Sequence, residues 1–215
     1  MTTLEYIERY KVICICRRMS KDDLMKLAHA LFDGGLRLME VTFDQQDPNC
    51  CEKAAEAISG LCREFGEEMQ FGAGTVLSIE QVDAAKSAGA KYIISPNTNI
   101  AVIRHTKETG LVSIPGAMTP SEIMTAHENG ADYVKLFPAT WLGYSYLKDI
   151  MAPISHVKLI ATGGVNEENL AQYLRLGIVG AGVSGRLTDK KLIEKGDFAE
   201  FTKRAAGFVS IANAG

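Results

Sequence analysis

The sequence lacks the features that mark membrane-spanning, secreted or nucleic-acid-binding proteins. No apolar stretch is long enough to span a bilayer, and the start, Met1 to Tyr10, has no apolar run of signal-peptide length. The net charge of −3 provides no basic surface that would attract nucleic acid or anionic lipid. These absences predict a cytoplasmic protein that binds neither nucleic acid nor membrane.

Cysteine is scarce and shows no metal-binding or redox spacing. The chain has five cysteines, an odd number, and none forms a Cys-x-x-Cys pair or has a neighbouring histidine. Cys14 and Cys16 alternate inside an apolar segment, which is typical of buried thiols. We therefore expect free cysteines rather than a disulfide framework or a zinc site.

What the sequence does show is an alternation of short apolar strands with amphipathic helical patterns along its 215 residues. The eight expected strands are 12–17, 38–43, 71–76, 92–95, 111–114, 131–139, 157–161 and 178–183. Expected helices lie at 21–32, 54–65, 79–87, 100–108, from 120 onward, 146–151, 166–176 and 198–211.

This order predicts an α/β fold, a single (β/α)8 TIM barrel with an extra N-terminal helix, in one domain over 1–215. No linker rich in proline, serine or charge divides the chain. A doubly wound open sheet is the alternative. Against it, no Gly-x-Gly-x-x-Gly follows the first strand and no reversal of strand order is evident.

Lys135 is unusual because it lies in the middle of the apolar strand 131–139. Side chains alternate along a strand, so Tyr133, Lys135 and Phe137 share one face. Burial there would disfavour the charged amine and lower its pKa, and a neutral amine is a nucleophile toward carbonyl carbon. The alternative is a structural lysine that reaches water or pairs with a carboxylate.

Glu40 is a second charged residue inside an apolar strand, where it shares a face with Leu38 and Thr42. Burial would raise its pKa and suit it to general acid–base catalysis. The alternative is a structural ion pair with Lys135 or Arg17. A buried acid and a buried lysine on different strands are the pair that a Schiff-base aldolase requires, which favours the catalytic interpretation.

Glycine-rich motifs follow the seventh and eighth strands, where barrels often bind phosphate. Thr162-Gly163-Gly164 precedes a helix that we expect Asn166 to cap, and Gly182 to Gly185 follows the next strand with Ser184 inside it. Glycine lets backbone N–H groups approach a ligand, and helix starts favour negative charge. The two motifs predict an anion site, with ordinary loop glycines as the alternative.

Several of these residues belong to motifs that occur in a fixed order. The motifs are Glu40-Val41-Thr42, Gly72-Ala73-Gly74-Thr75-Val76, Ser95-Pro96, Pro115-Gly116 with Thr119-Pro120-Ser121-Glu122, Lys135-Leu136-Phe137-Pro138-Ala139 and Thr162-Gly163-Gly164. The set resembles the class I 2-keto-3-deoxy-6-phosphogluconate (KDPG) / 4-hydroxy-2-oxoglutarate (KHG) aldolases. The likeness runs from about the first strand to the eighth.

The resemblance implies a homotrimeric barrel that needs no metal and no organic cofactor. It implies that Lys135 forms the Schiff base with a 2-keto acid and that Glu40 is the acid–base group. The implied substrate-binding residues are Thr75 for the pyruvyl carboxylate, Pro96 and Phe137 as pocket walls, and Gly163, Gly164 and Ser184 for the distal phosphate, beside Thr162 and Gly182.

Two departures from the family pattern concern the substrate. Many members have an arginine four residues after the glutamate, whereas this chain has Asp44 there. Arg17 resembles the arginine of the related 6-phosphogalactonate-cleaving branch and could supply the missing cation. The motif of the eighth strand, often Gly-Gly-Ser, is Gly182-Val183-Ser184 here.

The resulting hypothesis is a lyase that cleaves a 4-hydroxy-2-keto acid, KDPG or KHG, to pyruvate and an aldehyde. Cleavage of 2-keto-3-deoxy-6-phosphogalactonate (KDPGal) is the nearest alternative. A sugar-phosphate epimerase or isomerase on the same barrel is disfavoured, because the strand ends carry no paired acids and no inward histidines. A catalytically silent barrel that binds an anion is the third alternative.

Overall fold

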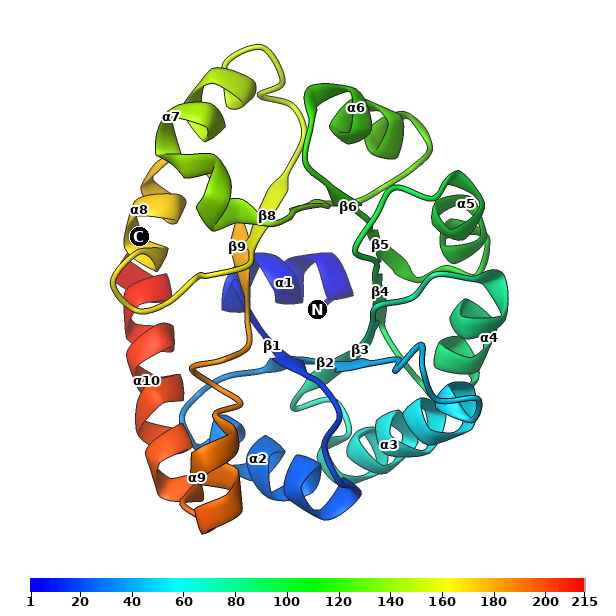
Figure 1. Ribbon diagram of the computed structural model, residues 1–215, viewed down its shortest axis with the longest axis vertical. Helices are drawn as coiled ribbons and strands as arrows, with labels where there is room; N and C mark the ends of the chain where they lie inside the picture. The colour runs from blue at the N-terminus through cyan, green and yellow to red at the C-terminus, as the bar shows by residue number, and fades with distance from the viewer. Residues whose placement is uncertain (215) are drawn as a thin grey trace.

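The computed structural model describes residues 1–214, apart from the side chain of Leu142. All nine strands of these residues form one parallel sheet in the order β5-β4-β3-β2-β1-β9-β8-β7-β6 (Figure 1). The strands are β1 Val12–Cys16, β2 Leu38–Thr42, β3 Gln70–Gly74, β4 Tyr92–Ile94, β5 Val112–Ile114, β6 Gly116–Ala117, β7 Val134–Leu136, β8 Leu159–Thr162 and β9 Gly180–Val183.

The ninth strand, β6, lies directly after Pro115, beyond the fifth expected strand 111–114, and was not predicted. Proline has no N–H to donate to a ladder, so the pairing changes there: β5 pairs with β4, and β6 pairs with β7. The N–H of Lys135 donates to the carbonyl of Pro115 at 2.8 Å, and the N–H of Tyr133 donates to Ser113 at 3.3 Å. These bonds join the two edges of the sheet, and the predicted barrel is confirmed.

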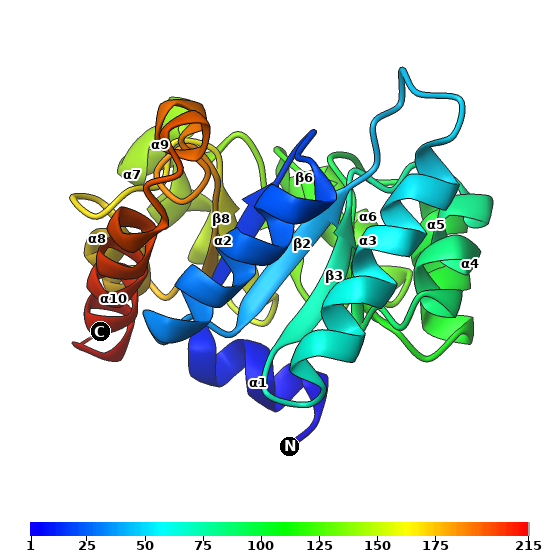
Figure 2. The ribbon, with the colours of Figure 1, turned by 90° about the horizontal axis from the view of Figure 1, so that it is seen from below.

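All helices but the first surround the ring of strands on its outer side (Figure 1). The helices are α1 Thr3–Tyr10, α2 Lys21–Asp33, α3 Cys50–Phe65, α4 Ile79–Ser87, α5 Ile100–Glu108, α6 Pro120–Glu128, α7 Ala139–Met151, α8 Leu170–Arg175, α9 Lys190–Lys195 and α10 Phe198–Ala214. The predicted N-terminal helix is present as α1, which lies across the amino end of the barrel (Figure 2).

The helix α9 was not expected from the sequence, and α3 begins four residues before its expected start at residue 54. Two other helices also differ from the sequence-based expectation. The helix expected over 146–151 begins at Ala139, but Gly143 interrupts it with a left-handed φ of 70°, so the expected piece is its second part. The helix expected over 166–176 begins only at Leu170. Asn166 does not cap it, because its side chain accepts hydrogen bonds from the N–H groups of Glu168 and Asn169 and forms a separate turn.

Two apolar clusters fill the molecule. The larger lies between the sheet and the helices. The smaller fills the barrel interior near its amino end and consists of Tyr6, Ile7, Ile13, Leu38, Tyr92, Ile94, Val112, Ile114, Tyr133 and Ile160. Because side chains alternate along a strand, the residues two positions after Leu38 and Tyr133 also face inward, nearer the carboxyl ends. Those residues are Glu40 and Lys135.

Candidate active site

Lys135 and Glu40 lie inside the barrel between the inner apolar cluster and the carboxyl ends of the strands. Lys135 is 2% exposed and Glu40 is 1% exposed. The Nζ atom of Lys135 lies 5.0 Å from the ring centroid of Phe137, and Tyr133 is buried on the other side in the inner cluster. The alternation predicted from the sequence therefore holds, and neither charged side chain faces the helices.

Burial changes the acid–base properties of both groups. Burial lowers the pKa of Lys135, the nearby carboxyl of Glu40 opposes this shift, and the charge of Arg17 adds to it. Burial raises the pKa of Glu40, although the charges of Lys135 and Arg17 oppose this shift. Neither carboxyl oxygen of Glu40 has a hydrogen-bond partner among residues 1–214. The pair thus combines an amine that loses its proton easily with an acid that is free to exchange one.

Gly74 at the end of β3 explains how Glu40 is fixed. A methyl group on the Cα of Gly74 would lie 2.5 Å from Oε1 and 2.8 Å from Cδ of Glu40. The carboxyl group therefore lies directly against the backbone of β3, in space that only glycine leaves free. This dependence of Glu40 on Gly74 cannot be read from the sequence, since a glycine in a strand gives no sign of which side chain occupies the space of its missing Cβ atom.

Arg17 and Thr75 meet at the mouth of the barrel. The Nη1 atom of Arg17 donates a hydrogen bond to Oγ1 of Thr75 at 3.1 Å. Arg17 follows β1 and Thr75 follows β3, so the contact crosses above β2. It places a guanidinium group close enough to Lys135 and Glu40 to shift the pKa of both.

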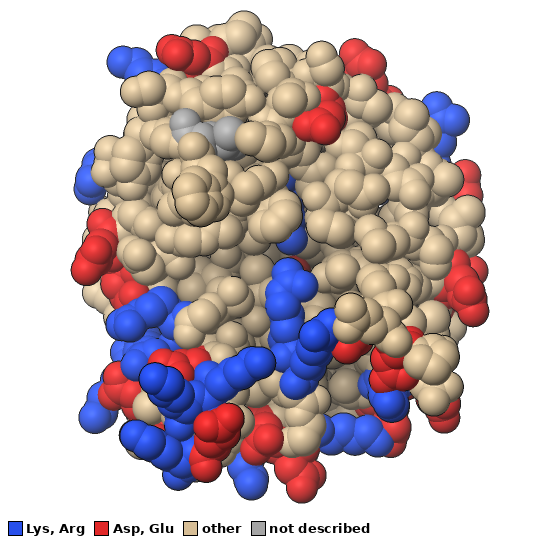
Figure 3. Space-filling model, viewed as in Figure 1, with Lys and Arg blue, Asp and Glu red and all other residues tan. Residues whose placement is uncertain are grey.

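A cavity of about 390 Å³ adjoins this pair at the ends of β1, β7, β8 and β9. Its lining contains seven of the nine predicted substrate-binding residues. These are Arg17, Phe137, Thr162, Gly163, Gly164, Gly182 and Ser184. A methyl group on Gly182 would lie 2.7 Å from Oγ1 of Thr162, so the two motifs are in direct contact. The cavity opens on the face shown in Figure 3, where Lys and Arg side chains gather on the lower half.

The remaining predicted residues lie outside this cavity. Thr75 contacts it only through Arg17, and Pro96 packs against Gly116 at the ends of β4 and β6. Arg186 does line the cavity, but its guanidinium is bound to the carboxylate of Glu167 through Nε at 3.0 Å and Nη2 at 3.1 Å. Arg17 is therefore the lining cation whose charge no carboxylate within 4.0 Å balances among the described residues.

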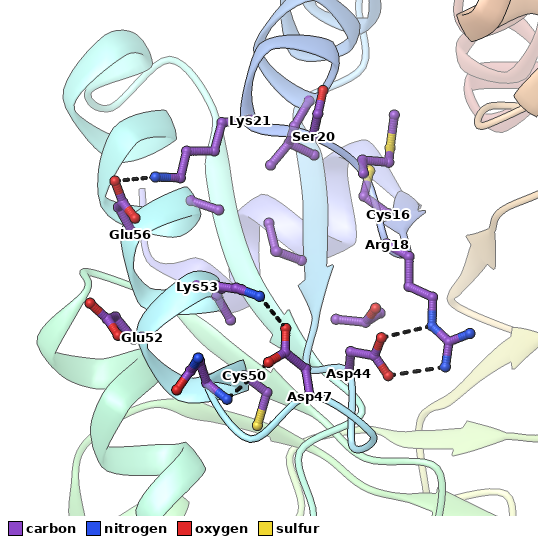
Figure 4. Close-up of a pocket in the computed structure, with 17 residues that line it drawn as sticks. Cys16, Arg18, Ser20, Lys21, Asp44, Asp47, Cys50, Glu52, Lys53 and Glu56 are labelled. Atoms are coloured by element: carbon purple, nitrogen blue, oxygen red, sulfur yellow. Dashed lines mark hydrogen bonds and ion pairs between the residues drawn. The ribbon is translucent and has the colours of Figure 1, made fainter.

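A separate cavity of about 560 Å³ lies between α2 and α3, outside the barrel (Figure 4). Arg18 and Asp44 line it and form an ion pair, with Nε to Oδ2 at 2.9 Å and Nη2 to Oδ1 at 3.0 Å. Arg18 therefore neutralises the charge of Asp44, at the position where many family members have an arginine.

Among residues 1–214, no group of three or more His, Cys, Asp or Glu side chains is arranged to hold a metal ion. All five cysteines are free thiols. None of the helices described is both long and apolar enough to cross a membrane.

A buried lysine with a lowered pKa beside a buried acid, at the carboxyl end of a (β/α)8 barrel, is the arrangement that a lysine Schiff-base lyase requires. The family model described as KDPG and KHG aldolase matches residues 4–204. The chain therefore belongs to the KDPG and KHG aldolase family, and the predicted enzyme class, a class I aldolase, is confirmed.

Curated relatives and solved structures agree with this assignment. The chain is 37% identical over 203 residues to 2-dehydro-3-deoxy-phosphogluconate aldolase of Treponema pallidum, covering 94% of this chain and 93% of the relative. It is 32% identical over 208 residues to 2-dehydro-3-deoxy-6-phosphogalactonate aldolase of Escherichia coli K12, covering 96% of each. A structure of KDPG aldolase from Legionella pneumophila, with pyruvate captured at low pH as a covalent carbinolamine intermediate, superposes with a TM-score of 0.84 at 27% identity, covering 94% of this chain and 95% of that one.

Proposed function

We propose that this aldolase cleaves a 4-hydroxy-2-keto acid phosphorylated at its far end, with KDPG as the first candidate, and that Lys135 is its Schiff-base residue. One observation carries the proposal: the only amine that the barrel interior buries beside an acid, among the described residues, is that of Lys135. The KDPG aldolase of T. pallidum supports the choice of substrate.

The reaction follows from the two buried groups. The neutral amine of Lys135 adds to the C2 ketone to give a carbinolamine, and loss of water leaves an iminium ion. Glu40, through a water molecule, takes the proton of the C4 hydroxyl. The C3–C4 bond then breaks, its electron pair forms the C2–C3 double bond while the C=N pair returns to nitrogen, and the neutral enamine and the aldehyde result.

The second half of the cycle returns the proton. Glu40 gives its proton to C3 of the enamine, and hydrolysis of the resulting iminium releases pyruvate and restores the amine. A carboxyl group whose pKa is raised by burial suits both roles, because it is basic enough to accept the proton and acidic enough to return it. The electrons go to the lysine adduct itself, so we propose that the enzyme uses neither a metal nor an organic cofactor.

The cavity lined by Arg17 and the glycine motifs suits the phosphate end of the substrate, and Thr75 at its edge suits the carboxylate end. We propose that Thr75, with Arg17 bound to its hydroxyl, receives the pyruvyl carboxylate. Gly163 and Gly164, both with left-handed φ, and Ser184 would then receive the phosphate through backbone N–H groups and the hydroxyl. Phe137 would form one wall of this cavity, and we propose that Pro96, which lies outside it, lines the path to Lys135.

KDPGal is the second candidate substrate. Two observations favour it. The cation at the mouth of the barrel is Arg17, directly after β1, which resembles the arginine of the KDPGal-cleaving branch, while position 44 holds an aspartate instead of an arginine. The chain is also 32% identical to a KDPGal aldolase. The two substrates differ in configuration, so measured rates of pyruvate release decide between them. A panel of KDPG, KDPGal and unphosphorylated KHG also tests the anion site, because fastest cleavage of KHG would refute the phosphate assignment.

Borohydride reduction in the presence of pyruvate tests the chemistry. We expect a stable pyruvyl adduct, which peptide mass mapping locates on Lys135, and no adduct on a Lys135→Met variant. Lys158→Met is the matched control, since Lys158 lies exposed before β8 and pairs with Glu8. An epimerase or a silent binding barrel would give no adduct, and an adduct on another lysine would refute the assignment.

We further propose that the enzyme is a cytoplasmic homotrimer. Five of the seven large apolar residues that are exposed lie at or just before the starts of α4 to α7. They are Leu77, Ile79, Ile100, Met118 and Trp141, the last 87% exposed. Sedimentation should give the mass of three chains, and Trp141→Ala should weaken assembly on the order of tenfold or more. Leu4→Ala, on α1 at the other end of the barrel, should leave it intact.

A further inference from the structure

Thr75 has a backbone conformation that its residue type rarely adopts. Its φ is 57°, in the left-handed region, and a β-branched residue there is a conformational outlier. Such strain persists only where the surrounding contacts hold it, and it concentrates at functional sites. The contacts that hold Thr75 are therefore part of the machinery that places its hydroxyl beside Arg17.

Gln45, from the loop after β2, contacts the backbone of Thr75. Its Nε2 atom donates to the carbonyl oxygen of Thr75 at 2.7 Å. Gln45 is exposed, and a long exposed side chain loses considerable conformational freedom when it is held in one position. A second group is needed to orient it.

Gln81 on α4 is that group. Its Nε2 atom donates to Oε1 of Gln45 at 2.9 Å, and its own Oε1 accepts from the N–H of Leu77 at 2.7 Å. Gln81 is buried, so a lost partner would leave a polar group unsatisfied, and the amide has few other orientations. The chain of bonds thus runs from the start of α4 through two amides to Thr75.

We propose that Gln45 and Gln81 are positioning residues that hold Thr75 in its left-handed conformation and thereby set the affinity for the carboxylate of the keto acid. This inference rests on the proposed role of Thr75 as the carboxylate ligand. Neither glutamine touches the reacting atoms: each acts through Thr75, and the lysine chemistry proceeds without them.

Two carbonyl probes separate this role from a general structural one. Pyruvate carries the carboxylate and acetone does not, while both can form a reducible adduct with Lys135. In Gln45→Ala, we expect the pyruvate concentration for half-maximal borohydride trapping to rise about five- to tenfold. This is the change in affinity that corresponds to the loss of one hydrogen bond. Trapping by acetone should stay as in the wild type. Gln81→Leu should act in the same direction, and Gln46→Ala, next to Gln45 but bonded to Arg18 instead, should change neither.

A glycine at position 75 provides the second test. Glycine adopts positive φ freely, so the holding contact is no longer needed for the backbone. Gln45→Ala should therefore have a smaller effect in a Thr75→Gly background than in the wild type. The inference would be overturned if Gln45→Ala had equal effects in both backgrounds. It would also be overturned if pyruvate trapping were unchanged in Gln45→Ala, or if trapping by pyruvate and by acetone fell in parallel. Absence of any pyruvate adduct on the wild-type enzyme would instead refute the proposed function.

Discussion

Gly74→Ala should inactivate the enzyme by displacing Glu40. The new methyl group would lie 2.5 Å from Oε1 of Glu40, whereas ordinary van der Waals contacts begin at 3.4 Å. Glu40 is 1% exposed, so it cannot avoid the methyl by turning into solvent. The carboxyl must move by roughly 1 Å, and a misplacement of that size at a reacting group can cost about 10²-fold in rate.

The assay is the turnover number for pyruvate release, measured beside the thermal midpoint of unfolding. We expect kcat to fall about 10²-fold while the variant remains folded and still forms the pyruvate adduct on Lys135. Gly207→Ala is the matched control, because a methyl group there meets nothing within 4 Å and the residue lies inside α10. It should leave kcat unchanged and raise the free energy of unfolding by about 0.5–1 kcal/mol.

Gly74→Ala in a Glu40→Gln background shows whether the loss passes through the carboxyl group. If Glu40 is the acid–base group, the double variant should be little slower than Glu40→Gln alone, since the group that the methyl displaces no longer works. A folded Gly74→Ala enzyme with the kcat of the wild type would refute the placement of Glu40. A fully additive double variant would refute the explanation by displacement.

Three further predictions follow from the charges at the site. Lys135→Met should raise the free energy of unfolding at neutral pH by about 1–3 kcal/mol, because a buried polar amine is replaced by an apolar chain of similar length. The pKa of Lys135 is lowered on folding, so the unfolded chain binds more protons than the folded one. The stability gained by Lys135→Met is therefore full below the lowered pKa and vanishes as pH approaches 10.5, and denaturation at several pH values measures this change. Arg17→Ala should raise KM for KDPG about tenfold or more and shift the pH profile of pyruvate trapping upward, because the arginine lowers the pKa of Lys135; an unshifted profile would contradict this. Asp44→Ala should leave kcat within about twofold of the wild type, since its exposed pair with Arg18 lies outside the barrel, and a large loss in steady-state turnover would show that the pair takes part in catalysis.

Much of the fold could be predicted because alternation of strand and helix is a strong local signal. The predicted ranges of α4 and α5 agree with the structure, and the strands differ only at their ends. The misses have local causes. The two residues of β6 are too few to show a period, and α9, with six residues and none of them buried, carries no amphipathic pattern.

The site could be predicted only in part, because its residues come from separate strands. Lys135 and Glu40 were recognisable as charges inside apolar strands, and the period of two gave their direction. The contact of Gly74 with Glu40 and the Arg18–Asp44 pair join residues distant in the chain, so no local pattern announces them. Gln81 did stand three residues after the cap Ser78, where a glutamine often bonds backward, but its bond to Gln45 depends on the fold.

The dependence of pyruvate trapping on pH tests the central claim most directly, because only the uncharged amine of Lys135 can attack the ketone. The initial rate of adduct formation on Lys135, located by peptide mass mapping, should rise to its plateau well below pH 10.5, the ordinary value for a lysine. A midpoint at that ordinary value, or an adduct carried by an exposed lysine such as Lys158, would contradict the account.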